Sequence, residues 1–160
     1  MPSPHALGSQ SINPSKLMEL EVLSQVVSTL QAKNDFKASI PYLAKMAQIV
    51  DNQQIGPSSP SSPSSQTPEQ RRQQQYLLDK LKADAHARLA DAYYKTGRFI
   101  ESEASLSLSV KLWETLMSKG YDDVRPLLMK AYDSLGQCYE ALHKPQMVKH
   151  MQTRKQKLVQ

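Results

Sequence analysis

The side chains best suited to catalysis are widely separated in this sequence. Histidines stand at positions 5, 86, 143 and 150, without the spacing of metal ligands. No glycine-rich phosphate loop, pair of carboxylates or Ser/His/Asp set can be recognised. Cys138, the single cysteine, falls on the apolar side of its segment, where a small core residue needs no further role. We therefore expect a chain that is not an enzyme and holds neither a metal nor another cofactor.

Composition restricts the compartment. The 160 residues contain no apolar run long enough to cross a bilayer, and the amino-terminal residues lack the basic and apolar regions of an export signal. A chain with one cysteine forms no internal disulfide, which is typical of a reducing compartment. We expect a protein of the cytoplasm, the nucleus or both, without membrane insertion.

Positive charge is concentrated at the carboxyl end. The net charge is +5, and no acidic residue follows Glu140. Five basic residues do follow it: Lys144, Lys149, Arg154, Lys155 and Lys157. This segment suggests an alternative function, a helical protein associated with RNA or ribonucleoprotein through a salt-sensitive attraction. No aromatic residues are interleaved there to stack on bases, which favours a solvated capping helix instead.

Apolar residues recur at steps of three and four along most of the chain, the period of amphipathic helices. This period predicts an all-α chain with helices near 14–33, 36–51, 70–96, 99–118, 127–142 and 145–158. Pro41 is expected to kink the second helix or move its start to about Ser39. We interpret 15–160 as one domain that follows a disordered tail, 1–14, and contains a flexible Ser/Pro-rich loop, about 52–70.

The fourth predicted helix carries two apolar stripes, which predicts packing on both sides. The first consists of Ile100, Ala104, Leu108 and Leu112, and the second of Leu106, Val110, Trp113 and Met117.

The stretch LADAYYKTGRFIES, residues 89–102, has the order that a tight helical hairpin needs. Small residues beside Leu89 let the second helix cross closely, and Tyr93 fills the space one turn later. Gly97 tolerates the positive φ of the turn, and Phe99 closes the gap between the helices. Residues 135–145 repeat the first half, with His143 at the position of Gly97. Residues 26–36 repeat it more weakly, with Asn34 at that position.

This order resembles the tetratricopeptide repeat, a helix-turn-helix unit of 34 residues. The spacings are longer here, since Leu89 follows Val26 by 63 residues and Leu135 follows Leu89 by 46. The resemblance implies a right-handed stack of about three antiparallel hairpins, an α-solenoid. Such arrays act as scaffolds or adaptors that hold a peptide or helix of a partner in a concave groove lined by the first helices.

The resemblance also implies which residues line the groove. The favoured partner-binding positions are Arg88, Asp91, Tyr94, Lys95, Lys130, Asp133 and Gln137. Further positions are Glu21, Ser24, Gln25 and Ser28 in the first hairpin, Asp84 and Ala87 in the second, and Ser134 and Glu140 in the third. The alternative is that these residues form a solvated polar face.

One variant of the family uses a clamp of Lys, Asn and Arg to hold the terminal carboxylate of heat-shock chaperones. The corresponding positions here hold Ser24, Ser28, Arg88 and Ser134, and Lys130 alone agrees. The resemblance therefore does not extend to a receptor for chaperone tails.

The loop offers Ser59, Ser62 and Thr67, each followed by proline, as proline-directed kinases require. Phosphate there would add negative charge just ahead of Arg71 and Arg72. Ser/Pro-rich spacers also contain such dipeptides by composition alone. Phosphorylation would indicate a eukaryotic protein.

Three hairpins are few for a repeat stack, so an exposed terminal hairpin is expected to associate with another subunit. The final helix has few residues to bury, which favours the carboxyl end for this contact.

Overall fold

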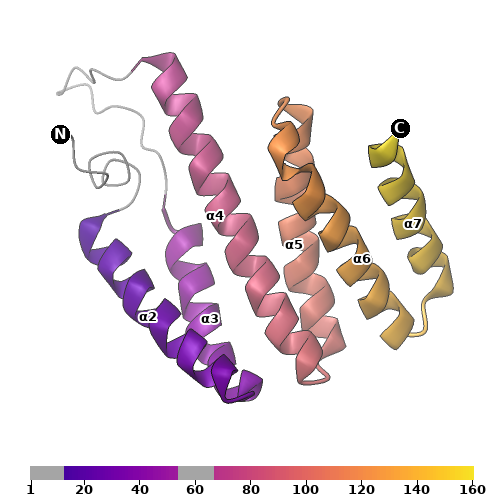
Figure 1. Ribbon diagram of the computed structural model, residues 1–160, viewed down its shortest axis with the longest axis horizontal. Helices are drawn as coiled ribbons and strands as arrows, with labels where there is room; N and C mark the ends of the chain where they lie inside the picture. Colours follow the sequence, from indigo (N-terminus) through magenta and orange to yellow (C-terminus); the bar gives the residue numbers. More distant parts are fainter. Residues whose placement is uncertain (1–12, 54–66) are drawn as a thin grey trace.

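The computed structural model describes residues 13–53 and 67–160. In these ranges the chain forms six α-helices and one short 3-10 helix, η1. They are α2 (Pro14–Ala32), α3 (Phe36–Asp51), α4 (Pro68–Lys95), α5 (Phe99–Ser118), η1 (Asp122–Val124), α6 (Arg125–Ala141) and α7 (Pro145–Val159). Each helix packs against the next along the chain, so that antiparallel pairs follow one another in order (Figure 1). None of these helices is both long and apolar enough to span a membrane.

The turns within the three pairs share one conformation. Asn34, Gly97 and His143 all have positive φ, of 58°, 79° and 58°. In each turn the residue after this one donates its N–H to a carbonyl five residues back: Asp35 to Leu30, Arg98 to Tyr93 and Lys144 to Tyr139, at 2.8–2.9 Å. This bond is one of the two in a Schellman motif, which closes a helix end with a residue of left-handed conformation. The predicted equivalence of these turns is confirmed.

The start of α3 agrees with the predicted range, 36–51, and the alternative start at about Ser39 is not adopted. Helix α3 begins at Phe36 and not at Ser39, because the Asp35 side chain accepts the N–H of Ala38 and caps it there. Pro41 therefore lies inside the helix, at the expense of one backbone hydrogen bond. Burial of Ile40 and Leu43 offsets this loss.

Helix α4 begins at Pro68, within the stretch predicted as loop. Thr67 accepts the N–H of Gln70 at 3.2 Å, and the Gln70 side chain accepts the N–H of Thr67 at 3.0 Å. This capping box satisfies two donors that a helix start leaves open. Residues 1–12 and 54–66, which hold most of the predicted tail and loop, lie outside the described residues.

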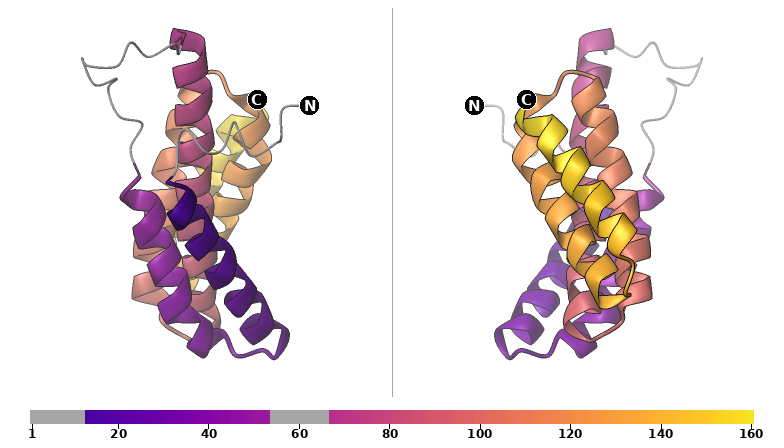
Figure 2. Two further views of the ribbon diagram at one scale, coloured as in Figure 1. Left: turned by 90° about the vertical axis from the view of Figure 1, so that its left-hand side faces the viewer. Right: turned by 90° about the vertical axis from the view of Figure 1, so that its right-hand side faces the viewer.

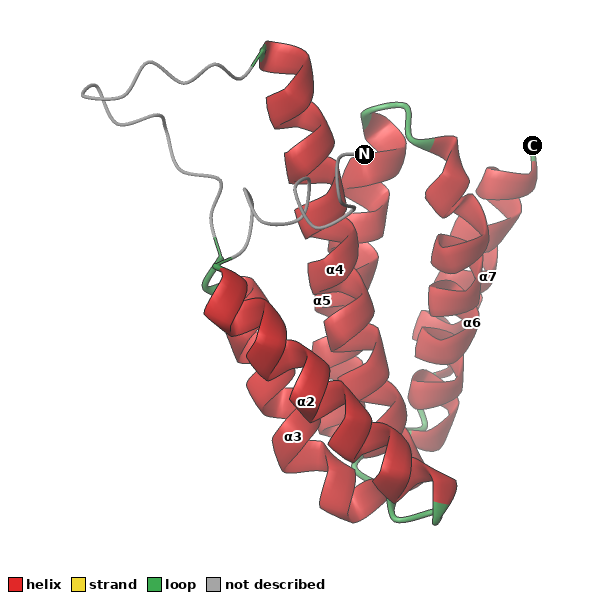
Figure 3. Cartoon of the chain, turned by 60° about the vertical axis from the view of Figure 1, so that its left-hand side comes forward, coloured by secondary structure: helices red, strands yellow, loops and turns green. Residues whose placement is uncertain are grey.

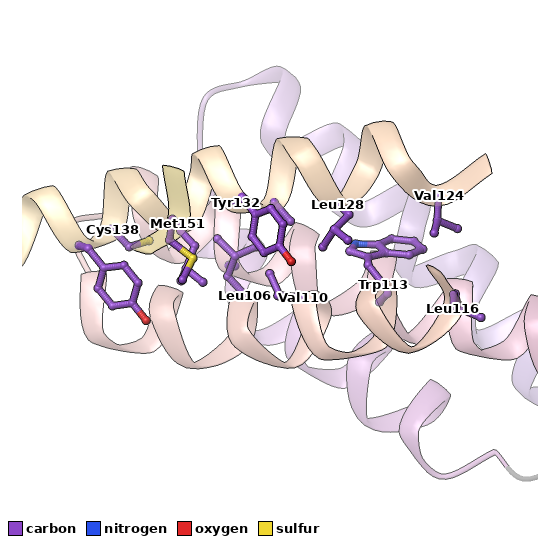
Figure 4. Close-up of a cluster of buried hydrophobic side chains, with 14 residues drawn as sticks. Leu106, Val110, Trp113, Leu116, Val124, Leu128, Tyr132, Cys138 and Met151 are labelled. Carbon is purple, nitrogen blue, oxygen red and sulfur yellow. The ribbon is translucent and has the colours of Figure 1, made fainter. Parts of the chain in front are cut away.

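The core divides into two clusters that share α4. Ala85, Leu89 and Ala92 belong to the cluster of α2 and α3. Ala83 and Ala90 belong to the second cluster, formed with α5, α6 and α7 (Figure 4). Helix α4 is therefore buried on two sides, and the views from the two ends show it between the terminal pairs (Figure 2).

One predicted stripe of α5 is not buried. Ile100 is 70% exposed and Leu108 is 48% exposed, so the prediction for that side was wrong. Helix α5 instead faces α4 with Ser102 and Ser109, whose Oγ atoms donate to the carbonyls of Ala90 and Ala83, each at 2.8 Å. The two backbones approach too closely there for a large side chain. The other predicted stripe, with Leu106, Val110 and Trp113, is buried as expected.

The predicted hairpin residues largely occupy their expected places. Leu89 and Ala90 are buried, and the half-buried Phe99 packs edge-on against Tyr94 with ring centroids 5.2 Å apart. Gly136 aligns with Ala90, but it does not lie at a close contact between helices. A Cβ added at Gly136 would meet no atom within 4 Å. The pair α6–α7 therefore needs no small residue at this position.

Candidate partner-binding groove

A concave groove of about 390 Å³ lies between α4 and α6. Helix α5 forms its floor, and Gln31 of α2 reaches one end. The α2–α3 pair is inclined to α4, while α6 lies on the far side of α4 and α5 (Figure 3). The walls consist mainly of Asp84, Ala87, Arg88, Asp91, Tyr94 and Lys95 from α4 and of Leu127, Lys130, Ser134 and Gln137 from α6.

Six of the seven favoured positions line this groove: Arg88, Asp91, Tyr94, Lys95, Lys130 and Gln137. Asp133 is not among the lining residues. Its carboxylate accepts both of its hydrogen bonds from Lys155 Nζ, at 2.9 Å, and so joins α6 to α7. The side chains of α6 therefore divide between the groove and the contact with α7.

The first hairpin contributes less than the resemblance implies. Glu21, Ser24 and Ser28 do not line the groove, and Gln25 lies in a separate shallow depression on α2. Gln31 does reach the groove, although the sequence offered no signal for it. The spacing of α6 could have indicated Leu127, which precedes Lys130 by about one turn on the same face.

The charges in the groove are only partly paired. Lys95 Nζ lies 3.0 Å from Asp91 Oδ2 and 4.3 Å from the centroid of the Phe36 ring, so these two charges already have partners. Arg88 and Lys130 form no ion pair with any described residue. Their charges are therefore available to a ligand.

At the bottom of the groove Cys138 of α6 meets Ser102 of α5. Cys138 donates to Ser102 Oγ at 3.3 Å, and burial raises the pKa of its thiol, which keeps it protonated. Without a thiolate or an adjacent base, this cysteine is a poor nucleophile. The lining groups can hold a ligand through hydrogen bonds, charge and apolar contact.

Other candidates for chemistry have structural partners. His86 points away from the groove, with Nε2 2.9 and 3.0 Å from the two carboxylate oxygens of Asp51 at the end of α3. Among the described residues there is no group of three or more His, Cys, Asp or Glu that could hold a metal ion. Thr67 caps α4, while Ser59 and Ser62 lie outside the described residues.

Three of the five basic residues of the carboxyl end pair with acidic residues of α5 and α6. Lys144 pairs with Glu103 of α5, Arg154 with Glu114 of α5 and Lys155 with Asp133 of α6, at 3.8, 3.1 and 2.9 Å. Arg154 also lies over the Tyr132 ring, whose hydroxyl donates to Glu114. These pairs reduce the charge that α7 can offer to RNA.

No protein-family model, curated protein or solved structure significantly matches the chain. The helices described are a set of sequential antiparallel pairs, and the groove is identified from their side chains alone.

Proposed function

We propose that this chain is a non-catalytic adaptor or assembly subunit, which docks a segment of a partner protein in the groove between α4 and α6. Its helix pairs would form a tetratricopeptide-like stack, with α4 and α6 as the first helices of two repeats. The proposal depends on one observation above all: the groove brings together six positions that the resemblance assigned to partner contact.

The shape and chemistry of the groove support a peptide or helix as the ligand. Along α4 the lining residues run from Asp84 to Lys95, a length of about 17 Å at 1.5 Å per residue. About five residues of extended chain, or three helical turns, would fill it. Arg88 and Lys130 offer charge from opposite walls, and Leu127, which is 41% exposed, offers apolar surface. These features fit a segment that carries both polar and apolar side chains.

The experiment is a capture of partners from native extract by the immobilised full chain, with identification by mass spectrometry. The test variant carries Arg88→Glu and Lys130→Glu. Lys95 is left intact because it contacts Asp91 and Phe36, and its loss would disturb a helix end. The control variant carries Lys149→Glu and Lys157→Glu, which make the same change in net charge at exposed positions of α7.

A partner retained by the wild-type chain and the α7 control, and lost from the groove variant, is the expected result. Circular dichroism should show the same helicity in all three chains. Equal capture by the groove variant and the wild type would refute the groove as the docking site.

A further inference from the structure

The first helices of the three pairs can be compared position by position from their turn residues, Asn34, Gly97 and His143. Three sets of equivalent positions lie five, eight and twelve residues before the turn residues, and each set has one member in α2, one in α4 and one in α6. The sets are Thr29, Ala92 and Cys138; Val26, Leu89 and Leu135; and Val22, Ala85 and Ala131.

In α4 and α6 these positions are covered by the preceding helix. Leu89 and Ala92 are 7% and 0% exposed in the cluster that contains α3. Leu135 and Cys138 are 3% and 1% exposed in the cluster that contains α5, and Cys138 contacts Ser102 of α5 directly. Each of these two helices therefore has a face that accepts an apolar helix.

Helix α2 has the same face, but no described helix covers it. Val22 is 59% exposed, and Met18, one turn earlier, is 69% exposed. Val22, Val26 and Thr29 line a shallow depression of about 340 Å³ together with Gln25 and Leu30. This surface continues the series of interfaces that α3 forms with α4 and α5 forms with α6.

The other end of the series is polar. Leu106 and Val110, nine and thirteen residues after Gly97, pack in the cluster that contains α6. The equivalent positions of α7, counted from His143, are Gln152 and Gln156, and both are exposed. Stacking α7 of one copy on α2 of another would bury these amides without apolar contact. The apolar face that no described helix covers therefore lies on the amino-terminal pair, and the carboxyl end presents polar side chains instead.

We propose that the outer face of α2, formed by Met18, Val22, Gln25, Val26 and Thr29, docks against the same face of a second copy of this chain. Met18, Val22 and Val26 form an apolar stripe like those of the helices that cover α4 and α6. The exposed stripe carries no charged side chain, so two copies meet without like-charge repulsion.

Pairing of identical faces closes after two copies and gives a two-fold dimer. The contact is limited to one helix of 19 residues from each copy, about 28 Å long. We expect a weak dimer that dissociates in the micromolar range, because so short a contact buries less than a standard interface.

The test is the mass of the full chain in solution, measured by sedimentation over a hundredfold range of concentration. The wild type should change from dimer to monomer on dilution. Val22→Glu should be monomeric throughout, and Ile100→Glu, on the exposed side of α5, should dimerise like the wild type. Monomeric wild type at every concentration, or loss of the dimer in Ile100→Glu but not in Val22→Glu, would overturn the proposal.

Disulfide crosslinking tests which residues of the two α2 helices face each other. Cys138 is 1% exposed, so the wild type presents no accessible thiol among its described residues. Under mild oxidation Gln25→Cys should form a disulfide-linked dimer, because Gln25 stands near the middle of the proposed face, where the two-fold axis of such a pair would bring the two sulfurs together. The control, His150→Cys on the outer side of α7, should remain monomeric. Failure of Gln25→Cys to crosslink, or equal crosslinking of both variants, would overturn this pairing.

Discussion

The same substitution, glycine to alanine, should have opposite effects at Gly136 and Gly97. Gly136 lies inside α6, and Gly97 lies in the turn between α4 and α5. An added Cβ would meet no atom within 4 Å at either position. The two effects therefore depend on backbone conformation alone, without a contribution from steric contact.

The magnitudes follow from that conformation. Inside a helix, alanine is more favourable than glycine by about 0.5–1 kcal/mol, so Gly136→Ala should stabilise the fold by that amount. Gly97 has φ of +79°, a conformation that costs a residue with a Cβ about 1–2 kcal/mol. Alanine also lowers the entropy of the unfolded chain, which returns about 0.4–1 kcal/mol. Gly97→Ala should destabilise the fold by about 1 kcal/mol net.

Urea denaturation followed by circular dichroism measures both variants. With a slope of about 2 kcal/mol per molar urea, the midpoint of Gly136→Ala should lie above that of the wild type and the midpoint of Gly97→Ala below it. The two variants should then differ from each other by about 1 M urea. Gly97→Asn serves as a control and should be nearer the wild type than Gly97→Ala, because Asn34 already adopts this conformation. Midpoints shifted in the same direction by the two alanine variants would refute the reasoning.

Three further outcomes are expected. Thr67→Ala removes the cap of α4 and should lower stability by about 1 kcal/mol, whereas Thr67→Ser should lower it far less; thermal denaturation compares the two. Ser109→Ala loses the bond to the Ala83 carbonyl and should cost about 1 kcal/mol, while Ser109→Leu forces α4 from α5 and should cost about 1–3 kcal/mol in urea denaturation. Burial and the hydrogen bond to Glu114 raise the pKa of Tyr132 above its ordinary value of 10.0. The folded state therefore holds this proton longer than the unfolded state, and stability should fall as pH rises above 10; a denaturation series at alkaline pH should show a weaker dependence for Tyr132→Phe.

Patterns of neighbouring residues in the sequence were sufficient to predict the helices, the turns within their pairs and most of the residues that line the groove. Helical periodicity depends on residues three and four apart, and the turns depend on single residues that tolerate positive φ. Asn34 and His143 could thus be aligned with Gly97 from the sequence, and all three have positive φ. The resemblance to the tetratricopeptide repeat implied six of the positions that line the groove, and they lie together because they share one face of each helix.

Contacts between helices were decided by the tertiary structure. Ser102 and Ser109 are buried while Ile100 is exposed, because the close approach of α4 leaves room for a hydroxyl but not for a branched side chain. The Asp133 side chain contacts α7 and not the groove, because Lys155 lies opposite it. The exposed apolar face is on α2 and not on α7. A sequence shows which faces of a helix are apolar or charged. Which of them is covered depends on the element that lies opposite, and that is a property of the packed chain.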